Sequence, residues 1–254
     1  MTSRPGMKKV LIVTGGGRGI GAAIARLAAA DGYAVCLSYL SNQAAADEVV
    51  ASIAAKGGVA LAVQADVAVE QDVVRLFGQV DASLGRVTAL VNNAGILERQ
   101  GRVEDMDAAR IGRIFATNVI GSFICAREAI RRMSTRHGGS GGAIVNLSSR
   151  ASRLGAPGEY VDYAASKGAI DTFTVGLAKE VAAEGIRVNA VSPGVIYTDI
   201  HASGGEPGRV ERVKDAIPMR RGGTAEEVAR AVLWLLSDAA SYTTGASIDV
   251  AGGR

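Results

Sequence analysis

The sequence predicts an α/β domain with a doubly wound parallel sheet, and two observations support this prediction. First, the chain contains short, continuous apolar runs, which are typical of strands buried on both faces of a sheet. Second, these runs alternate with helix-like segments along the whole chain, which is the pattern of successive βαβ units whose helices cover both faces of a sheet. The 254 residues contain no internal repeat and no interdomain linker, so one domain over residues 1–254 is expected.

The apolar runs define the expected strands. They are rich in Val, Ile, Leu and Ala, and several end at Gly, Asn or Ser, which favour turns. The expected strands are residues 8–15, 33–39, 59–67, 87–95, 143–149, 186–194 and 247–250.

Between these runs, apolar residues recur at helical spacing. The expected helices are residues 19–30, 44–57, 71–85, 107–133, 162–183 and 225–237. Asp162 is a suitable N-cap for the helix at 162–183, because its carboxylate can accept a hydrogen bond from the first turn.

Two segments fall outside this alternation. Residues 195–224 have no strong period and are rich in glycine, and so long a loop inside a compact domain is usually functional. We expect residues 195–220 to form a lid over a substrate site, with a short helix near 207–216. The first seven residues lack the apolar segment of a secretory signal and are expected to be a flexible lead-in.

Composition and charge argue against several classes of function. The net charge of +3 is spread along the chain, and the basic cluster at 131–137 suits a helix C-terminus, so nucleic-acid binding is not expected. No apolar run reaches the roughly 18 residues that cross a bilayer. The two histidines stand apart from other ligand residues, so no metal site is expected. Cys36 and Cys125 lie far apart in apolar stretches, which indicates reduced core residues of a cytoplasmic protein.

A glycine-rich loop, VTGGGRGIG, joins the first expected strand to the first expected helix. Glycines allow a sharp turn and close approach of a pyrophosphate, which the positive end of the helix attracts. A plain tight turn is the alternative, but the βαβ context is the one that dinucleotide binding requires. The expected binding residues are Gly15, Gly17, Arg18, Gly19, Ile20 and Gly21.

The end of the second strand bears on the choice of dinucleotide. An acid about 20 residues after the glycines would bind the ribose 2′-hydroxyl of NAD and repel the 2′-phosphate of NADP. The stretch SYLSNQ (38–43) contains no acid, whereas a guanidinium and hydrogen-bonding groups are offered by Arg18, Ser38, Ser41 and Asn42. NADP(H) is therefore expected, with NAD(H) less favoured; for Arg18, an exposed turn residue is the alternative.

Two tyrosines precede a lysine in EYVDYAASKG (159–168), and helical spacing distinguishes them. Lys167 stands at i+4 from Tyr163, on the same helix face, whereas the residue at i+4 from Tyr160 is Ala164. A unit charge at ~4 Å with an effective dielectric constant of about 20 contributes about 4 kcal/mol, or roughly three pKa units. Such an ammonium would bring the phenol pKa toward neutrality, so Tyr163 is the expected general acid/base. Tyr160 is expected to line the substrate pocket or to pack beneath the lid.

Taken together and in order, these motifs resemble those of the short-chain dehydrogenase/reductase family. The resemblance covers about residues 8–253 and rests on TGxxxGxG from Thr14, Asp66, NNAG (92–95), Asn118, Ser149, YxxxK and PG (193–194). It implies a Rossmann fold, and hydride transfer between a nicotinamide cofactor and a carbonyl compound or secondary alcohol. It also implies a homotetramer packed partly through helices 107–133 and 162–183.

The resemblance assigns roles to individual residues. The implied catalytic residues are Asn118, Ser149, Tyr163 and Lys167, with Ser149 bonding the substrate oxygen and Asn118 holding a water relay behind Lys167. Besides the glycine loop, Tyr163 and Lys167, the resemblance implies cofactor contacts by Asp66 at the adenine and by Val67. It also implies that Asn92, Ala94 and Gly95 lie along the cofactor, and that Pro193, Gly194, Ile196 and Thr198 lie at the nicotinamide.

Some alternatives remain open on the sequence. The loop from Ser149 to Tyr163 is one residue longer than is usual in the family, so Ser148 is the alternative donor. A sugar 1-dehydrogenase shares every motif, and a catalytically idle dinucleotide-binding regulator is the alternative of another class. The sequence does not specify the substrate. The basic residues expected near the mouth of the site could bind a polar or anionic substrate, or they could form a solvated rim: Arg99, Arg150, Arg153, His201 and Arg209.

Overall fold

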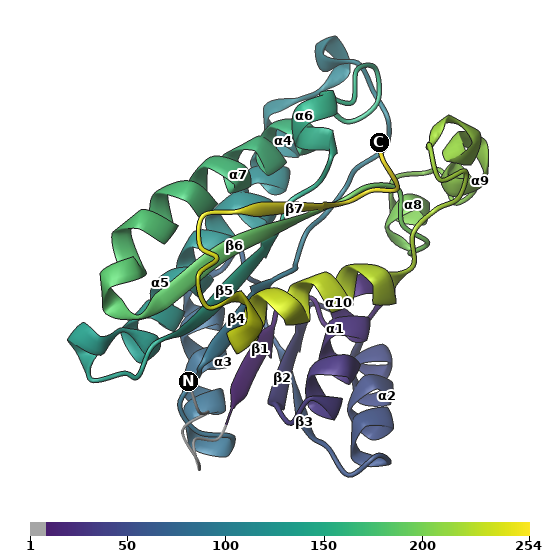
Figure 1. Cartoon of the computed structure of the whole chain (residues 1–254). Coiled ribbons are helices and arrows are strands. Elements are labelled where there is room, and N and C mark those ends of the chain that lie inside the picture. The colour runs from purple at the N-terminus through teal and green to yellow at the C-terminus, as the bar shows by residue number, and fades with distance from the viewer. Residues whose placement is uncertain (1–8) are drawn as a thin grey trace.

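The computed structural model describes residues 9–254, which form one seven-stranded parallel sheet (Figure 1). The strand order is β3-β2-β1-β4-β5-β6-β7. The strands are β1 (Val10–Val13), β2 (Ala34–Tyr39), β3 (Val59–Gln64), β4 (Ala89–Asn92), β5 (Gly142–Leu147), β6 (Ile186–Pro193) and β7 (Ser247–Val250). The predicted doubly wound α/β fold is confirmed. The flexible lead-in expected at residues 1–7 lies outside the described residues.

Helices cover both faces of the sheet (Figure 1). One layer consists of α1 (Gly19–Ala30), α2 (Gln43–Ala54) and α10 (Ala225–Leu236). The other layer includes α3 (Glu70–Ser83), α5 (Gly121–Met133) and α7 (Val161–Val181). No helix within residues 9–254 is long and apolar enough to span a membrane.

Alternate strand residues supply the two halves of the core. In β1, Leu11 and Val13 pack on the α1 side, whereas Val10 and Ile12 pack on the opposite side, and none is more than 1% exposed. A parallel sheet buried on both faces has continuous apolar strands, which is why the apolar runs located these strands in the sequence.

The strand order reverses between β1 and β4. In open parallel sheets, ligands bind outside the carboxyl ends of the strands at such a switch point. The glycine loop follows β1 there, and the segments carrying Ser149 and Gly194 follow β5 and β6. The topology therefore places the predicted site residues at one edge of the sheet.

The helix expected over residues 107–133 is interrupted. It consists of α4 (Ala108–Phe115), a π-helical turn (Ala116–Ile120) and α5. A π turn accommodates one extra residue and is frequent at functional sites. Asn118 lies in this turn and is 1% exposed.

The N-terminus of α7 differs from the expectation. The helix begins at Val161, and Tyr160 occupies the N-cap position without a side-chain capping bond. Asp162, the expected cap, lies inside the first turn and pairs with Arg110 of α4 at 2.7 Å. The prediction of Asp162 as N-cap is therefore wrong: its carboxylate holds α4 against α7.

The lid contains α8 (Ile200–Ser203), α9 (Arg209–Val213) and a 3₁₀ turn (Lys214–Ala216). The short helix expected near 207–216 is confirmed. These segments lie outside the two helical layers (Figure 1). A further short helix, α6 (Ala151–Leu154), lies between β5 and α7.

Candidate active site

A cavity of about 480 Å³ lies at the carboxyl ends of the strands, with the lid forming part of its wall. Its lining brings together predicted residues from distant parts of the chain. They are Ile20, Gly95, Ser148, Ser149, Tyr160, Tyr163, Lys167, Pro193, Gly194, Ile196, Thr198, His201 and Arg209.

Backbone conformation at two positions and close packing at a third explain glycines of the loop. Gly15 and Gly19 have φ of +62° and +52°, a region that L side chains rarely adopt. A Cβ atom on Gly21 would lie 2.5 Å from both Asn93 Nδ2 and the Gly15 carbonyl oxygen. Asn93 Nδ2 itself donates hydrogen bonds to the carbonyl oxygens of Thr14 (2.8 Å) and Gly15 (3.0 Å). The loop is thus held against the end of β4.

The N-terminus of α1 has no neutralising group of its own. Arg18 at the N-cap makes no side-chain capping bond, and the first turn contains no acidic residue. The free backbone N–H groups and the positive end of the helix favour an anion. Together with the glycine packing, this arrangement fits a dinucleotide pyrophosphate.

The residues expected near the ribose have different positions. Arg18 and Ser41 are exposed, and Arg18 has no ion pair within residues 9–254. Asn42 caps α2 through a hydrogen bond that its side chain accepts. Ser38 is fully buried, and its Oγ accepts a hydrogen bond from Gly15 N at 3.2 Å. Its hydroxyl therefore supports the glycine loop from beneath, and the expected contact of Ser38 with a ribose phosphate stays a prediction.

Two residues expected at the cofactor follow β3: Asp66, expected at the adenine, and Val67. Asp66 Oδ1 accepts a hydrogen bond from Ala68 N at 2.9 Å, which shapes the turn. Val67 is buried beneath Gly121, where a Cβ atom would lie 2.8 Å from Val67 Cγ2. These contacts show a structural role for both residues, and their contact with the cofactor stays a prediction.

The NNAG segment joins neighbouring elements. Asn92 Nδ2 donates to Asn146 Oδ1 at 2.9 Å, and Asn146 Nδ2 donates to Thr174 Oγ1 at 2.9 Å. This chain of side-chain amides connects β4, β5 and α7. Ala94 N donates to Thr14 Oγ1 at 3.0 Å and so positions the segment beside the glycine loop.

Ser148 and Ser149 both line the cavity with Tyr163, but their hydroxyls have different partners. Ser149 Oγ accepts a hydrogen bond from Ala151 N at 3.1 Å. The Ser148 hydroxyl is 3% exposed and donates to the Lys167 carbonyl at 3.3 Å. Burial raises the pKa of Tyr163, and the bond to Ser149 opposes that shift.

Lys167 is a buried cation beside the tyrosine. It is 4% exposed, and its Nζ donates to the Leu147 carbonyl at 2.8 Å. Burial lowers the pKa of Lys167 to about 8, and the negative charge of Asp171 opposes the shift. The lowered phenol pKa expected from the ammonium is not found in the chain alone, because burial of Tyr163 is the larger effect.

Asn118 connects the segment after β4 to α7. Its Oδ1 accepts a hydrogen bond from Ile96 N at 2.8 Å, and its Nδ2 donates to Ile96 O (3.1 Å) and Ser166 Oγ (3.0 Å). A Cβ atom on Gly95 would lie 3.5 Å from Asn118 Oδ1 and 3.6 Å from Lys167 Nζ. The π turn therefore brings Asn118 next to Lys167 across Gly95.

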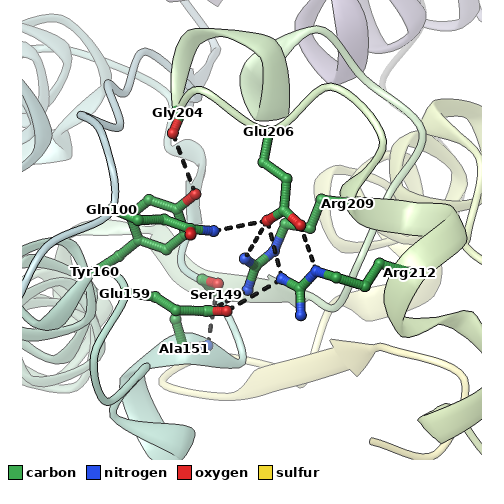
Figure 2. Close-up of polar contacts among 9 residues, drawn as sticks. All are labelled: Gln100, Ser149, Ala151, Glu159, Tyr160, Gly204, Glu206, Arg209 and Arg212. Atoms are coloured by element: carbon green, nitrogen blue, oxygen red, sulfur yellow. Dashed lines mark hydrogen bonds and ion pairs between the residues drawn. The ribbon is translucent and has the colours of Figure 1, made fainter.

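Tyr160 connects α7 to the lid. Its ring is 3% exposed, and its hydroxyl donates to the Gly204 carbonyl at 3.4 Å (Figure 2). The Arg209 guanidinium lies 5.1 Å from the centre of the ring. Tyr160 therefore does what each of the two alternative expectations stated: it packs beneath the lid, and it also lines the cavity.

Sequence reasoning missed the acidic partners of the lid arginines. Figure 2 shows Glu159, before α7, and Glu206, in the lid, facing Arg209 and Arg212. Arg209 pairs with Glu159 at 2.5 Å and with Glu206 at 3.2 Å. Gln100 Nε2 also donates to Glu206, at 2.6 Å. The i,i+3 spacing of Glu206 and Arg209 is a local signal, but charges in a loop usually indicate a solvated surface, and the partner Glu159 lies 50 residues before Arg209.

The other basic residues near the cavity are also accounted for. Arg150 pairs with Asp249 at 2.6 Å. His201 Nε2 is hydrogen-bonded to the Ile196 carbonyl at 2.9 Å, and burial lowers the pKa of the ring. Arg99 and Arg153 lie outside the lining. Within residues 9–254, no group of three or more His, Cys, Asp or Glu side chains could hold a metal ion.

Comparison with known proteins identifies relatives over nearly the whole chain. Residues 15–254 match the family model described as enoyl-(acyl carrier protein) reductase. The uncharacterized oxidoreductase YgfF of Escherichia coli K12 is 61% identical over 96% of this chain and 99% of its own. A 3-oxoacyl-[acyl-carrier-protein] reductase of Synechocystis is 39% identical over 96% of both chains.

A solved structure shows the same fold. The crystal structure of a dehydrogenase/reductase from Sinorhizobium meliloti 1021 is similar with a TM-score of 0.89 and 33% identity, covering 96% of this chain and 94% of that one. Fold, motif order and relatives agree, and the chain belongs to the short-chain dehydrogenase/reductase family of oxidoreductases acting on carbonyl and alcohol groups.

Proposed function

We propose that the protein is an NADP(H)-dependent oxidoreductase that transfers a hydride between nicotinamide and a carbonyl compound or secondary alcohol, with Tyr163 as general acid/base. One observation carries the proposal: Tyr163, Ser149 and the buried Lys167 line one cavity, with Lys167 Nζ 5.6 Å from the centre of the Tyr163 ring. The same cavity is lined by Ile20 at the start of α1. The proposed proton donor and the proposed dinucleotide loop therefore border the same cavity.

A nicotinamide cofactor, when bound, would supply the hydride for the carbonyl carbon in the reducing direction. Tyr163 donates its phenolic proton to the carbonyl oxygen, which becomes the hydroxyl of the product alcohol. The Ser149 hydroxyl donates a hydrogen bond to the same oxygen and orients it. The Lys167 ammonium stabilises the phenolate left on Tyr163. Asn118 holds the segment after β4 in place through its hydrogen bonds to Ile96. In the role proposed from the family resemblance, it also holds the water relay that returns a proton through Lys167.

The preference for NADP(H) over NAD(H) is supported by charge. Arg18 presents a guanidinium at the start of α1 that is exposed and without an ion pair within residues 9–254. No acid lies in residues 38–43 to repel a 2′-phosphate. The glycine loop, Asp66, Val67, the NNAG segment and residues 193–198 complete the proposed cofactor site.

A homotetramer in the cytoplasm is part of the same proposal. On α5 and α7, Phe123 is 49% exposed and stacks on Phe173, and Val175 is 43% exposed. Ile120, in the π turn before α5, is 52% exposed. Neighbouring exposed apolar side chains favour a subunit contact on this face.

Steady-state turnover tests the proposal. The purified protein is assayed with NADPH and NADH against ketones, quinones, keto-esters and aldoses, and with NADP and NAD against the corresponding alcohols and sugars, following nicotinamide absorbance. Turnover of at least one ketone with NADPH is expected, and it should be lost in Tyr163→Phe. Exclusive oxidation of sugars would indicate the sugar 1-dehydrogenase. NADPH binding without any turnover would indicate the idle regulator.

A further inference from the structure

Four charged residues join the lid to the segment before α7, and we call them the ion cluster: Glu159, Glu206, Arg209 and Arg212 (Figure 2). Arg209 bonds both carboxylates, at 2.5 Å to Glu159 and 3.2 Å to Glu206. Arg212 also bonds both, at 3.2 Å to Glu159 and more closely to Glu206. Each acid therefore lies between two guanidinium groups.

The ion cluster is charged but balanced. Hydrogen bonding to Arg212 lowers the pKa of Glu206 to about 2, and hydrogen bonding to Arg209 lowers the pKa of Glu159. Both acids are ionised at neutral pH, so two negative charges compensate two positive ones. The side chain of Arg209 is 12% exposed, and a guanidinium so far out of water needs such partners.

Arg209 and Glu159 both line the cavity. The Arg209 guanidinium covers the ring of Tyr160, 5.1 Å from its centre, and both residues belong to the wall of the cavity that Tyr163 also lines. Because its N–H groups already bond carboxylates, its charge is not available to an anionic substrate. Arg150, another guanidinium of the lining, is similarly paired with Asp249.

The lining near these ion pairs is largely apolar. It includes Leu97, Leu154, Ala156, Pro157 and Ile200. Polar groups of the lining are partly engaged: the Tyr160 hydroxyl donates to the Gly204 carbonyl, and His201 Nε2 is hydrogen-bonded to the Ile196 carbonyl. Arg254 is the remaining arginine of the lining, and its side chain has no ion pair within residues 9–254.

We propose that the ion cluster neutralises Arg209 so that the cavity selects an uncharged, largely apolar carbonyl compound, with Glu159 as the residue that determines this preference. The inference rests on the proposed function and specifies its substrate class. A carboxylate or phosphate on the substrate would have to displace Glu159 from Arg209 or enter an apolar wall, and both cost free energy.

The test compares kcat/KM for keto-esters and the keto acids of the same carbon skeleton, with NADPH. The wild-type protein should prefer the ester. Glu159→Gln leaves one unmatched positive charge in the ion cluster. The ratio of kcat/KM for the acid to kcat/KM for the ester should therefore rise by about tenfold or more, which corresponds to one charge-assisted hydrogen bond. The change should arise mainly from KM. A lid that is merely loosened would raise KM for both substrates and leave the ratio unchanged.

Glu211→Gln is the matched control, because Glu211 pairs with Lys214 in the same lid but lies outside the lining. It should leave the ratio at the wild-type value.

Three results would overturn the inference: a wild-type preference for the keto acid, an unchanged ratio in Glu159→Gln, or an equal shift in Glu211→Gln. Absence of turnover with every carbonyl compound would instead contradict the proposed function.

Discussion

The Lys167 Nζ atom lies 5.6 Å from the centre of the Tyr163 ring. The two residues are four positions apart in α7, so their side chains lie on one face of the helix. Burial lowers the pKa of Lys167 to about 8 and raises that of Tyr163. The chain alone therefore holds an ammonium below about pH 8 beside a phenol that remains protonated.

This pair makes carbonyl reduction sensitive to pH. The ammonium stabilises the phenolate that forms when Tyr163 gives up its proton, and the ammonium is lost as the pH rises through about 8. The value of kcat/KM for reduction should therefore fall above about pH 8. In Lys167→Met this inflection should disappear and the rate should be lower throughout. A wild-type profile that stays flat across this range would contradict the role of Lys167.

The two tyrosines should differ in what their hydroxyls do. Tyr163→Phe keeps the packed ring but removes the transferable proton, so kcat should fall by at least about 10²-fold. Tyr160→Phe removes a hydrogen bond to Gly204 in the lid, so its effect should fall mainly on KM. Steady-state kinetics and circular dichroism on both variants check this. Near-normal turnover in Tyr163→Phe, with an inactive Tyr160→Phe, would reverse the assignment.

The two serines after β5 offer a paired comparison. The Ser148 hydroxyl donates to a backbone carbonyl of α7, whereas the Ser149 hydroxyl accepts a hydrogen bond from Ala151 N and lines the cavity with Tyr163. Ser149→Ala should lower kcat and leave NADPH affinity nearly unchanged, because its hydroxyl is proposed to bond the substrate oxygen. Ser148→Ala should have a much smaller effect on kcat. The opposite order of effects would identify Ser148 as the donor.

Arg18 should decide part of the cofactor preference. Arg18→Ala is expected to reduce the preference for NADPH over NADH by roughly 1–3 kcal/mol, the range of a charge-assisted contact. Arg26→Ala is the control, because Arg26 is an exposed arginine further along α1 whose side chain donates to Ser52 of α2. Values of kcat/KM for both cofactors measure the effect. A wild-type preference for NADH would contradict the assignment of Arg18.

Two glycines predict opposite effects of an added methyl group. Gly21→Ala would place a Cβ atom 2.5 Å from Asn93 Nδ2, so a loss of about 1–3 kcal/mol in the free energy of unfolding and weaker NADPH binding are expected. Gly78 lies in α3, where an added Cβ atom meets nothing within 4 Å. Gly78→Ala should stabilise the protein by about 0.5–1 kcal/mol. Urea denaturation of both variants checks these values, and equal effects would contradict the packing argument.

The fold could be predicted because its strands are buried on both faces and therefore appear as apolar runs. The π turn at Asn118 could not, since one extra residue in a helix changes backbone hydrogen bonding without changing the composition of the buried face. Asp162 was misplaced for a related reason: its carboxylate pairs with Arg110, which lies 52 residues earlier in the chain.

Side-chain direction limited the prediction of the site. The pattern around Ser38 located the end of β2 correctly, but only the structure shows its hydroxyl beneath Gly15. The ion cluster was missed because the bonds that join it to the segment before α7 connect residues 50 and 53 positions apart, Glu159 with Arg209 and Arg212. Local spacing identified Tyr163 and Lys167 because their relationship is contained in one helix.

Gly95 is a glycine for a reason other than backbone conformation. Its φ is not among the positive values of the described glycines, and an added Cβ atom would meet Asn118 Oδ1 and Lys167 Nζ at ordinary contact distances. An alanine would therefore fit, but it would insert hydrocarbon between an amide and a buried ammonium. The absent side chain sets the local dielectric environment of Lys167, because a less polar surrounding would favour the neutral amine.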